Sequence, residues 1–89
     1  MNTIHSDIVS KAKDWGIKFI HGRKEQPQEY VEFDGGMFSH VKYVAQKSGD
    51  WWVVFRVMPG RNGTVETLQS FKSFDAAVNY ALDACNVGK

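Results

Sequence analysis

Three histidines and one cysteine are the residues of this chain whose types most often bind metal ions or act as nucleophiles. His5, His21 and His40 are scattered, and none is placed at i, i+4 with a second ligand on a helix. Cys85 has no partner in a Cys-x-x-Cys spacing, and its position on an apolar helical stripe is typical of a small buried hydrophobic residue. The sequence therefore predicts no metal site, no cofactor and no cysteine nucleophile.

Carboxylates and glycines, the next residues that could do chemistry, also lack a catalytic pattern. Glu25, Glu29 and Glu32 surround a predicted loop and strand start, and acid/base catalysis would need one of them buried, which nothing in the sequence indicates. The glycines at 35–36 and 60–63 lie between predicted strands and not ahead of a helix, so neither pair forms a phosphate loop. No nucleophile, base and orienting group can be combined, and we expect a protein that is not an enzyme.

The composition predicts one folded domain over residues 1–89. The apolar fraction of 43% and the aromatic fraction of 13% suffice for a core, and 89 residues leave no room for two cores. A domain this small buries a modest share of its surface, which leaves homodimerisation open. The single cysteine and the absence of a signal peptide or an apolar membrane span predict a soluble, cytoplasmic protein that does not bind membranes.

Periodicity predicts the elements that would position any site. Apolar spacing from Ser6 to Trp15 predicts a short amphipathic helix capped by Ser6 or Asp7, and a longer apolar stripe after Ser73 predicts a C-terminal helix. The predicted inward positions of that helix are Phe74, Ala77, Val78, Ala81, Leu82 and Cys85. Between the helices, β-branched and aromatic segments separated by glycine-bearing turns predict strands at 17–22, 29–33, 37–46, 51–58 and 64–71. The fold class is therefore α+β, an antiparallel meander sheet with three to four strands, packed by the C-terminal helix and accompanied by the short N-terminal one.

Alternation along the strand 51–58 predicts which side chains share a face. Trp51, Val53, Phe55 and Val57 form a purely apolar set and are predicted to face the core, which turns Trp52 and Arg56 to solvent. On the strand before it, Val41, Tyr43 and Ala45 are predicted inward. On the strand after it, Leu68 is predicted inward.

This phasing predicts a binding surface on the exposed sheet face. A tryptophan surrounded by cations can stack on bases while the cations pair with phosphates, and an alternative of equal weight is an amphipathic Trp that packs under a helix. Residues 36–72 hold five Lys/Arg against two Asp/Glu, so the middle of the chain is its basic part. The predicted binding residues are His40, Lys42, Lys47, Trp52, Arg56 and Arg61.

The stretch from Val41 to Ala84 resembles the three-stranded-sheet-plus-helix DNA-binding domain of plant ethylene-response factors, with relatives in phage integrases and homing endonucleases. Trp51 and Arg56 match the family's second strand. The helix entry is matched by Leu68, Phe71, Ala76 and Ala77. The resemblance implies that the sheet face lies in the DNA major groove. The chain departs from the family at Gln69, where a glycine is usual, and at Tyr80, which comes one position early.

Two functions follow as alternatives from these observations. The first is nucleic-acid binding through the basic, tryptophan-containing sheet face. The second is a protein-interaction or inhibitor module of phage or mobile-element origin that acts on a host protein, because Trp, Tyr and Arg are the usual interface anchors. A basic stripe on the folded surface would favour the first alternative, and an apolar patch with mixed charge would favour the second.

Overall fold

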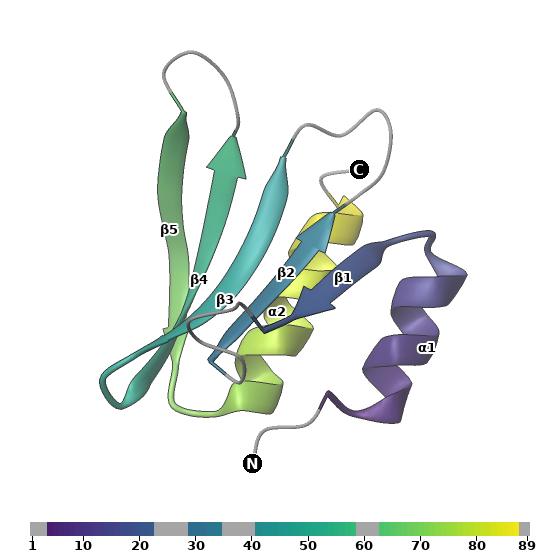
Figure 1. Cartoon of the computed structure of the whole chain (residues 1–89), viewed down its shortest axis with the longest axis horizontal. Helices are drawn as coiled ribbons and strands as arrows, with labels where there is room; N and C mark the ends of the chain where they lie inside the picture. Colours follow the sequence, from purple (N-terminus) through teal and green to yellow (C-terminus); the bar gives the residue numbers. More distant parts are fainter. Residues whose placement is uncertain (1–3, 23–28, 35–40, 59–62, 88–89) are drawn as a thin grey trace.

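The computed structural model describes residues 4–22, 29–34, 41–58 and 63–87. It contains two helices and five strands, which follow the order α1, β1 to β5, α2 along the chain (Figure 1). Their bounds are α1 Ser6–Asp14, β1 Lys18–His21, β2 Tyr30–Asp34, β3 Lys42–Ser48, β4 Trp51–Met58, β5 Thr64–Phe71 and α2 Phe74–Val87.

The five strands form one antiparallel sheet in sequence order, β1-β2-β3-β4-β5. The predicted α+β meander with a helix at each end is therefore confirmed. The sheet has five strands, more than the three to four predicted, because β1 pairs with β2 from Lys18↔Asp34 to His21↔Val31 and so extends the meander. The turn predicted at residues 34–36 lies mostly outside the described residues.

Helix α2 covers one face of the sheet through its predicted apolar stripe. All six predicted inward positions of α2 are buried, and they share one core with Val31, Phe33, Ala45 and Val54 of the sheet. Ser73 precedes the first turn, and its hydroxyl oxygen accepts the backbone N–H of Ala76 at 3.3 Å, which is the N-cap predicted for this residue. Cys85 is buried in the stripe as predicted.

Helix α1 lies beside the sheet at its β1 edge and contacts both β1 and α2 (Figure 1). Ile8 and Ala12 bury its inner face, and Gly16, at φ 68°, ends the helix in the left-handed conformation that glycine accepts. The N-cap is His5, so the prediction of Ser6 or Asp7 is wrong by one or two residues. In the described parts of the chain, neither helix combines the length and the apolar character needed to cross a membrane.

The β3–β4 hairpin shows that the predicted phasing of β4 is wrong. The turn consists of Gly49 and Asp50 alone, with Gly49 at φ 63°, and not of the four residues 47–50. The two-residue turn pairs Ser48 with Trp51 and, further along, Ala45 with Val54. Ala45 faces α2, and since directly paired residues point to the same side, Val54 must face α2 as well.

The consequence is that the two tryptophans exchange roles. Trp52 is 4% exposed, and its ring contacts Phe74 of α2 edge-on at 4.8 Å between centroids. Trp51 is 46% exposed on the opposite face. The inward predictions for Val41, Tyr43, Ala45 and Leu68 are confirmed, since Tyr43 and Ala45 belong to the core and Val41 and Leu68 pack against it.

Candidate binding surface

The sheet face turned away from α2 is called the open face here, because no helix of the described chain lies on it. Figure 1 looks onto this face, with α2 behind the sheet. Its side chains follow from the strand registers and from the core contacts of their neighbours. The open face consists of Lys18, Ile20, Tyr30, Glu32, Asp34, Lys42, Val44, Gln46, Ser48, Trp51, Val53, Phe55, Val57, Val65, Thr67 and Ser70.

Apolar side chains dominate the β4–β5 side of the open face. Trp51 is 46% exposed and Val65 is 60% exposed, while Val53 and Phe55 are half-buried between them. Ser48, Trp51, Val53 and Ser70 line a shallow hollow of about 410 Å³. This surface presents an aromatic ring, a branched apolar side chain and two hydroxyl groups to a ligand that approaches the sheet.

The ammonium group of Lys72 contacts this surface. The Nζ atom of Lys72 lies 5.1 Å from the centroid of the Trp51 ring, within the range of a cation–π contact. Lys72 is exposed and directly follows Phe71, which pairs with Trp52, so it lies next to Trp51 at the end of the sheet. A ligand that stacks on that side of Trp51 has to displace the ammonium group or pair with it.

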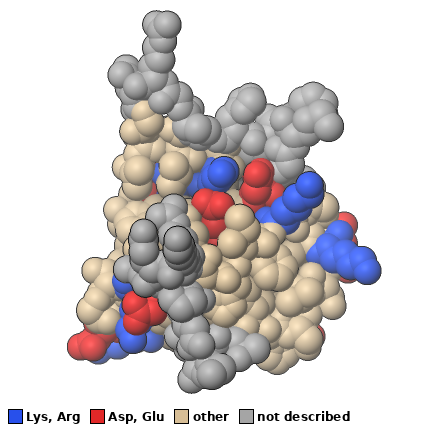
Figure 2. Space-filling view, in the orientation of Figure 1, with Lys and Arg blue, Asp and Glu red and all other residues tan. Residues whose placement is uncertain are grey.

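The charges on the open face are mixed. Lys42 Nζ lies 3.9 Å from Glu32 Oε2, and Lys18 of β1 is paired in register with Asp34 of β2. Figure 2 shows blue and red side chains next to one another in the upper middle of this view, with uncharged side chains to their left and below them. Over the described residues the surface is therefore an apolar patch with balanced charge, and the basic stripe expected for nucleic-acid binding is not formed there.

The predicted binding residues do not gather on one face. Lys42 lies on the open face, while Lys47, Trp52 and Arg56 point to the side of α2. Trp52 is buried in the core, so the prediction that it faces solvent is wrong. The physical reason is the antiparallel pairing across the turn: with an even number of turn residues Trp52 and Val54 share the face of Ala45, so an inward Ala45 is incompatible with an inward Trp51. His40 and Arg61 lie outside the described residues.

Arg56 forms an ion pair with a carboxylate of the neighbouring strand. Its Nη2 donates a short hydrogen bond to Glu66 Oε2 on the neighbouring strand β5. That hydrogen bond and the charge of Glu66 raise the pKa of Arg56, and Tyr43 adds a smaller contribution of the same sign. Arg56 lines a groove formed by Tyr43, Leu68, Tyr80, Asp83, Ala84 and Val87 beside α2. The guanidinium is thus held by a carboxylate on the helix side and is not part of the open face.

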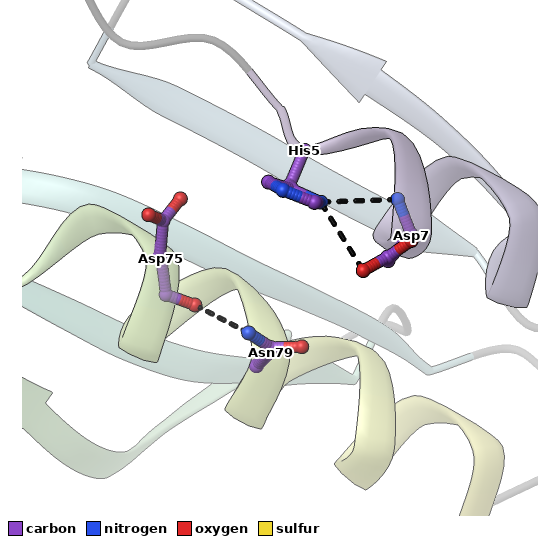
Figure 3. Close-up of polar contacts among 4 residues, drawn as sticks. All are labelled: His5, Asp7, Asp75 and Asn79. Carbon is purple, nitrogen blue, oxygen red and sulfur yellow. Dashed lines mark hydrogen bonds and ion pairs between the residues drawn. The ribbon is translucent and has the colours of Figure 1, made fainter.

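A second hollow between the starts of the two helices contains residues that a hydrolase could use. It is lined by the N-cap His5 and by Asp7 and Ser10 of α1, together with Asp75 and Asn79 of α2. Figure 3 shows His5, Asp7, Asp75 and Asn79. His5 Nδ1 accepts the backbone N–H of Asp7 at 3.2 Å, so this nitrogen cannot also donate a proton to the Asp7 carboxylate 3.5 Å away.

The remaining polar contact of this hollow also belongs to a helix. Asn79 Nδ2 donates to the backbone carbonyl of Asp75 at 3.0 Å, four residues earlier on α2 (Figure 3). The contacts of His5 and Asn79 in the hollow therefore belong to the cap of α1 and to the backbone of α2. Among the described residues, no group of three His, Cys, Asp or Glu side chains is placed to hold a metal ion.

Sequence reasoning missed Trp51, Val53 and Lys72 as surface residues. The signal that could have found them is the dipeptide Gly49-Asp50, since a two-residue hairpin turn fixes which β4 residues pair with the inward residues of β3. Comparison with known proteins adds no relative: no family model matches the chain, and neither a curated protein nor a solved structure is found to be similar to it.

Proposed function

We propose that this chain is a small, non-enzymatic binding module that binds a protein partner through the β4–β5 side of its open face, with Trp51 as the anchor. The observation that carries the proposal is the half-exposed Trp51 ring among the apolar neighbours Val53, Phe55 and Val65 on a face of balanced charge. Protein interfaces concentrate their binding energy in a few central aromatic side chains, which are surrounded by near-neutral contacts that exclude water.

The charge distribution supports a protein partner over a nucleic acid. Nucleic-acid binding draws its affinity from several lysines and arginines that neutralise phosphates at once. On the strands of the open face, Lys42 lies near Glu32 and Lys18 lies across from Asp34, so these two lysines each have a carboxylate beside them, and Lys72, which follows β5, lies over the Trp51 ring. A protein partner needs no such excess of positive charge, and an apolar patch with a polar rim is what it would recognise.

Affinity capture from native lysate tests this proposal with two matched variants. Trp51→Ala removes the proposed anchor, and Tyr80→Ala removes an aromatic side chain of similar exposure, 39%, on α2. We expect wild type and Tyr80→Ala to capture the same protein, and nuclease treatment of the lysate should not abolish this capture. Trp51→Ala should bind that protein at least about tenfold more weakly, which corresponds to the roughly 1.4 kcal/mol or more that an interface anchor contributes. Equal capture by Trp51→Ala would contradict the proposal.

The contact between Lys72 and Trp51 favours nucleic acid as the second candidate partner. A base could stack on the indole while the ammonium, 5.1 Å from the ring centroid, pairs with the adjacent phosphate. Lys72→Met separates the two partners by the sign of its effect. A nucleic-acid complex would weaken and its salt dependence would fall by about one phosphate contact, whereas an apolar protein contact would be unchanged or strengthened.

A titration at low salt with a short mixed-sequence DNA duplex and a thymidine oligonucleotide measures this directly. Absence of binding by wild type excludes the second candidate. Binding that weakens both in Trp51→Ala and in Lys72→Met would establish nucleic acid as the partner and would overturn the proposal of a protein.

A further inference from the structure

Strand β5 forms the edge of the sheet and presents an unusually open side. It is the last strand in the sheet order and spans eight residues, twice the four residues of β1 at the opposite edge. Six of its eight residues are exposed. Among the described residues, no strand pairs with its outer side. An antiparallel edge of this kind offers a row of backbone N–H and C=O groups to another strand.

The composition of β5 lacks most of the features that keep sheet edges from pairing. Its sequence TVETLQSF contains no proline, glycine or lysine. Its one charged residue, Glu66, is turned toward Arg56 on β4 and forms an ion pair there. A bulge where Val54 and Phe55 meet β5 interrupts the ladder, because Val54 pairs with Gln69 while Phe55 pairs with Thr67. Regular pairing with β4 therefore falls into two segments, Gln69–Phe71 and the longer Thr64–Thr67.

We propose that a second copy of this chain pairs with the longer of these two segments, β5 against β5, antiparallel and related by a two-fold axis perpendicular to the sheet. A two-fold axis in this direction keeps the two open faces on one side and both α2 helices on the other. Residues directly opposite one another then share a face, so only registers that pair residues of like orientation are allowed.

The positions of Glu66 and of the exposed Val65 together favour one register among these. Centring the axis on Glu66 would set the two carboxylates directly against each other, which is unfavourable. Centring it on Val65 pairs Val65 with Val65 of the second copy and places Glu66 opposite Thr64 of the second copy. This register also covers Val65, which at 60% is among the most exposed large apolar side chains of the described chain. The dimer extends the sheet to ten strands and doubles the open face.

Sedimentation equilibrium of the full chain tests the dimer with a matched pair of variants. Wild type should rise from 10.1 kDa toward twice that mass as concentration increases. Val65→Lys should stay monomeric over the same range, because a lysine on the edge blocks pairing. Ile20→Lys places the same charge at a 58% exposed position of the opposite edge strand and should dimerise like wild type. A monomeric wild type, or a Val65→Lys variant that dimerises normally, would overturn the proposal.

Cysteine cross-linking tests the register and does not depend on the folding of the lysine variant. In Val65→Cys the two thiols face each other at a spacing that a disulfide can span, whereas in Thr67→Cys, on the same strand and face, the thiols lie on the order of 14 Å apart. The native Cys85, 1% exposed, is left in place. Mild oxidation should link Val65→Cys into a dimer and leave Thr67→Cys monomeric; equal cross-linking of both would overturn this register. A monomeric chain that still binds a protein through Trp51 would refute the dimer alone.

Discussion

Replacing each tryptophan of the β4 pair with alanine should produce opposite losses of stability and binding. Trp52 is 4% exposed and contacts Phe74, so Trp52→Ala removes a large buried side chain and leaves a cavity between β4 and α2. Truncations of this kind cost about 3–5 kcal/mol. At roughly 0.05–0.15 kcal/mol per residue, 89 residues give a total stability of about 4–13 kcal/mol, so Trp52→Ala removes a large share of it.

Trp51→Ala should cost much less, about 1–2 kcal/mol. The ring is 46% exposed, so roughly half of its area stays in water in the native state and solvent fills the space that the substitution leaves. The measurement is urea unfolding followed by far-ultraviolet circular dichroism, since the fluorescence of three tryptophans would not separate the sites. With a slope of about 1–3 kcal/mol per molar urea, the two midpoints should differ by roughly 0.3–4 M, and by about 1 M for the middle of both ranges. A midpoint for Trp51→Ala at or below that of Trp52→Ala would refute the assigned phase of β4.

Two further substitutions test how α2 is held to the sheet. Leu82→Asp places a carboxylate at a position that is 0% exposed and should cost several kcal/mol, enough to unfold a marginal domain. Asp83→Asn, at the adjacent exposed position, should melt like wild type. Thermal melting compares the two variants, and a stable Leu82→Asp would show that the core is misassigned. Ser73→Ala removes the acceptor of the Ala76 N–H and should lower the free energy of unfolding in urea by about 1 kcal/mol. Ser73→Asp keeps an acceptor and should retain wild-type stability. If Ser73→Ala is as stable as wild type, the cap contributes nothing to stability.

The C-terminal helix could be predicted in full because one physical rule decides it. Every position of its inward stripe is apolar, and Asp75, Asn79 and Asp83 mark the opposite side, so the 3.6-residue period has one solution. The meander could be predicted for a related reason, since β-branched segments alternate with glycine-bearing turns. Strand β1 was among the predicted segments, and the sequence did not show that it joins the same sheet.

The phase of β4 could not be predicted from its own residues. In WWVVFRVM both alternating sets begin with a tryptophan and a valine, so polarity does not decide which set faces α2. The set with Arg56 was excluded from the core for its charge, yet Arg56 lies on the helix side in a groove near the end of α2, where Glu66 pairs with it. The pairing with β3 decides the phase, because an even number of turn residues puts Trp52 and Val54 on the face of the inward Ala45, and through it decides which tryptophan is available to a partner.

Photo-cross-linking from the β4 surface tests the central claim, that the Trp51 side of the open face binds a protein. A photoreactive phenylalanine analogue at position 51, compared with the same analogue at position 80 on α2, reports which surface touches the partner in the cells that produce the chain. The account predicts a discrete, nuclease-resistant protein adduct from position 51 and none from position 80. An adduct only from position 80, or one from position 51 that nuclease removes, would contradict it.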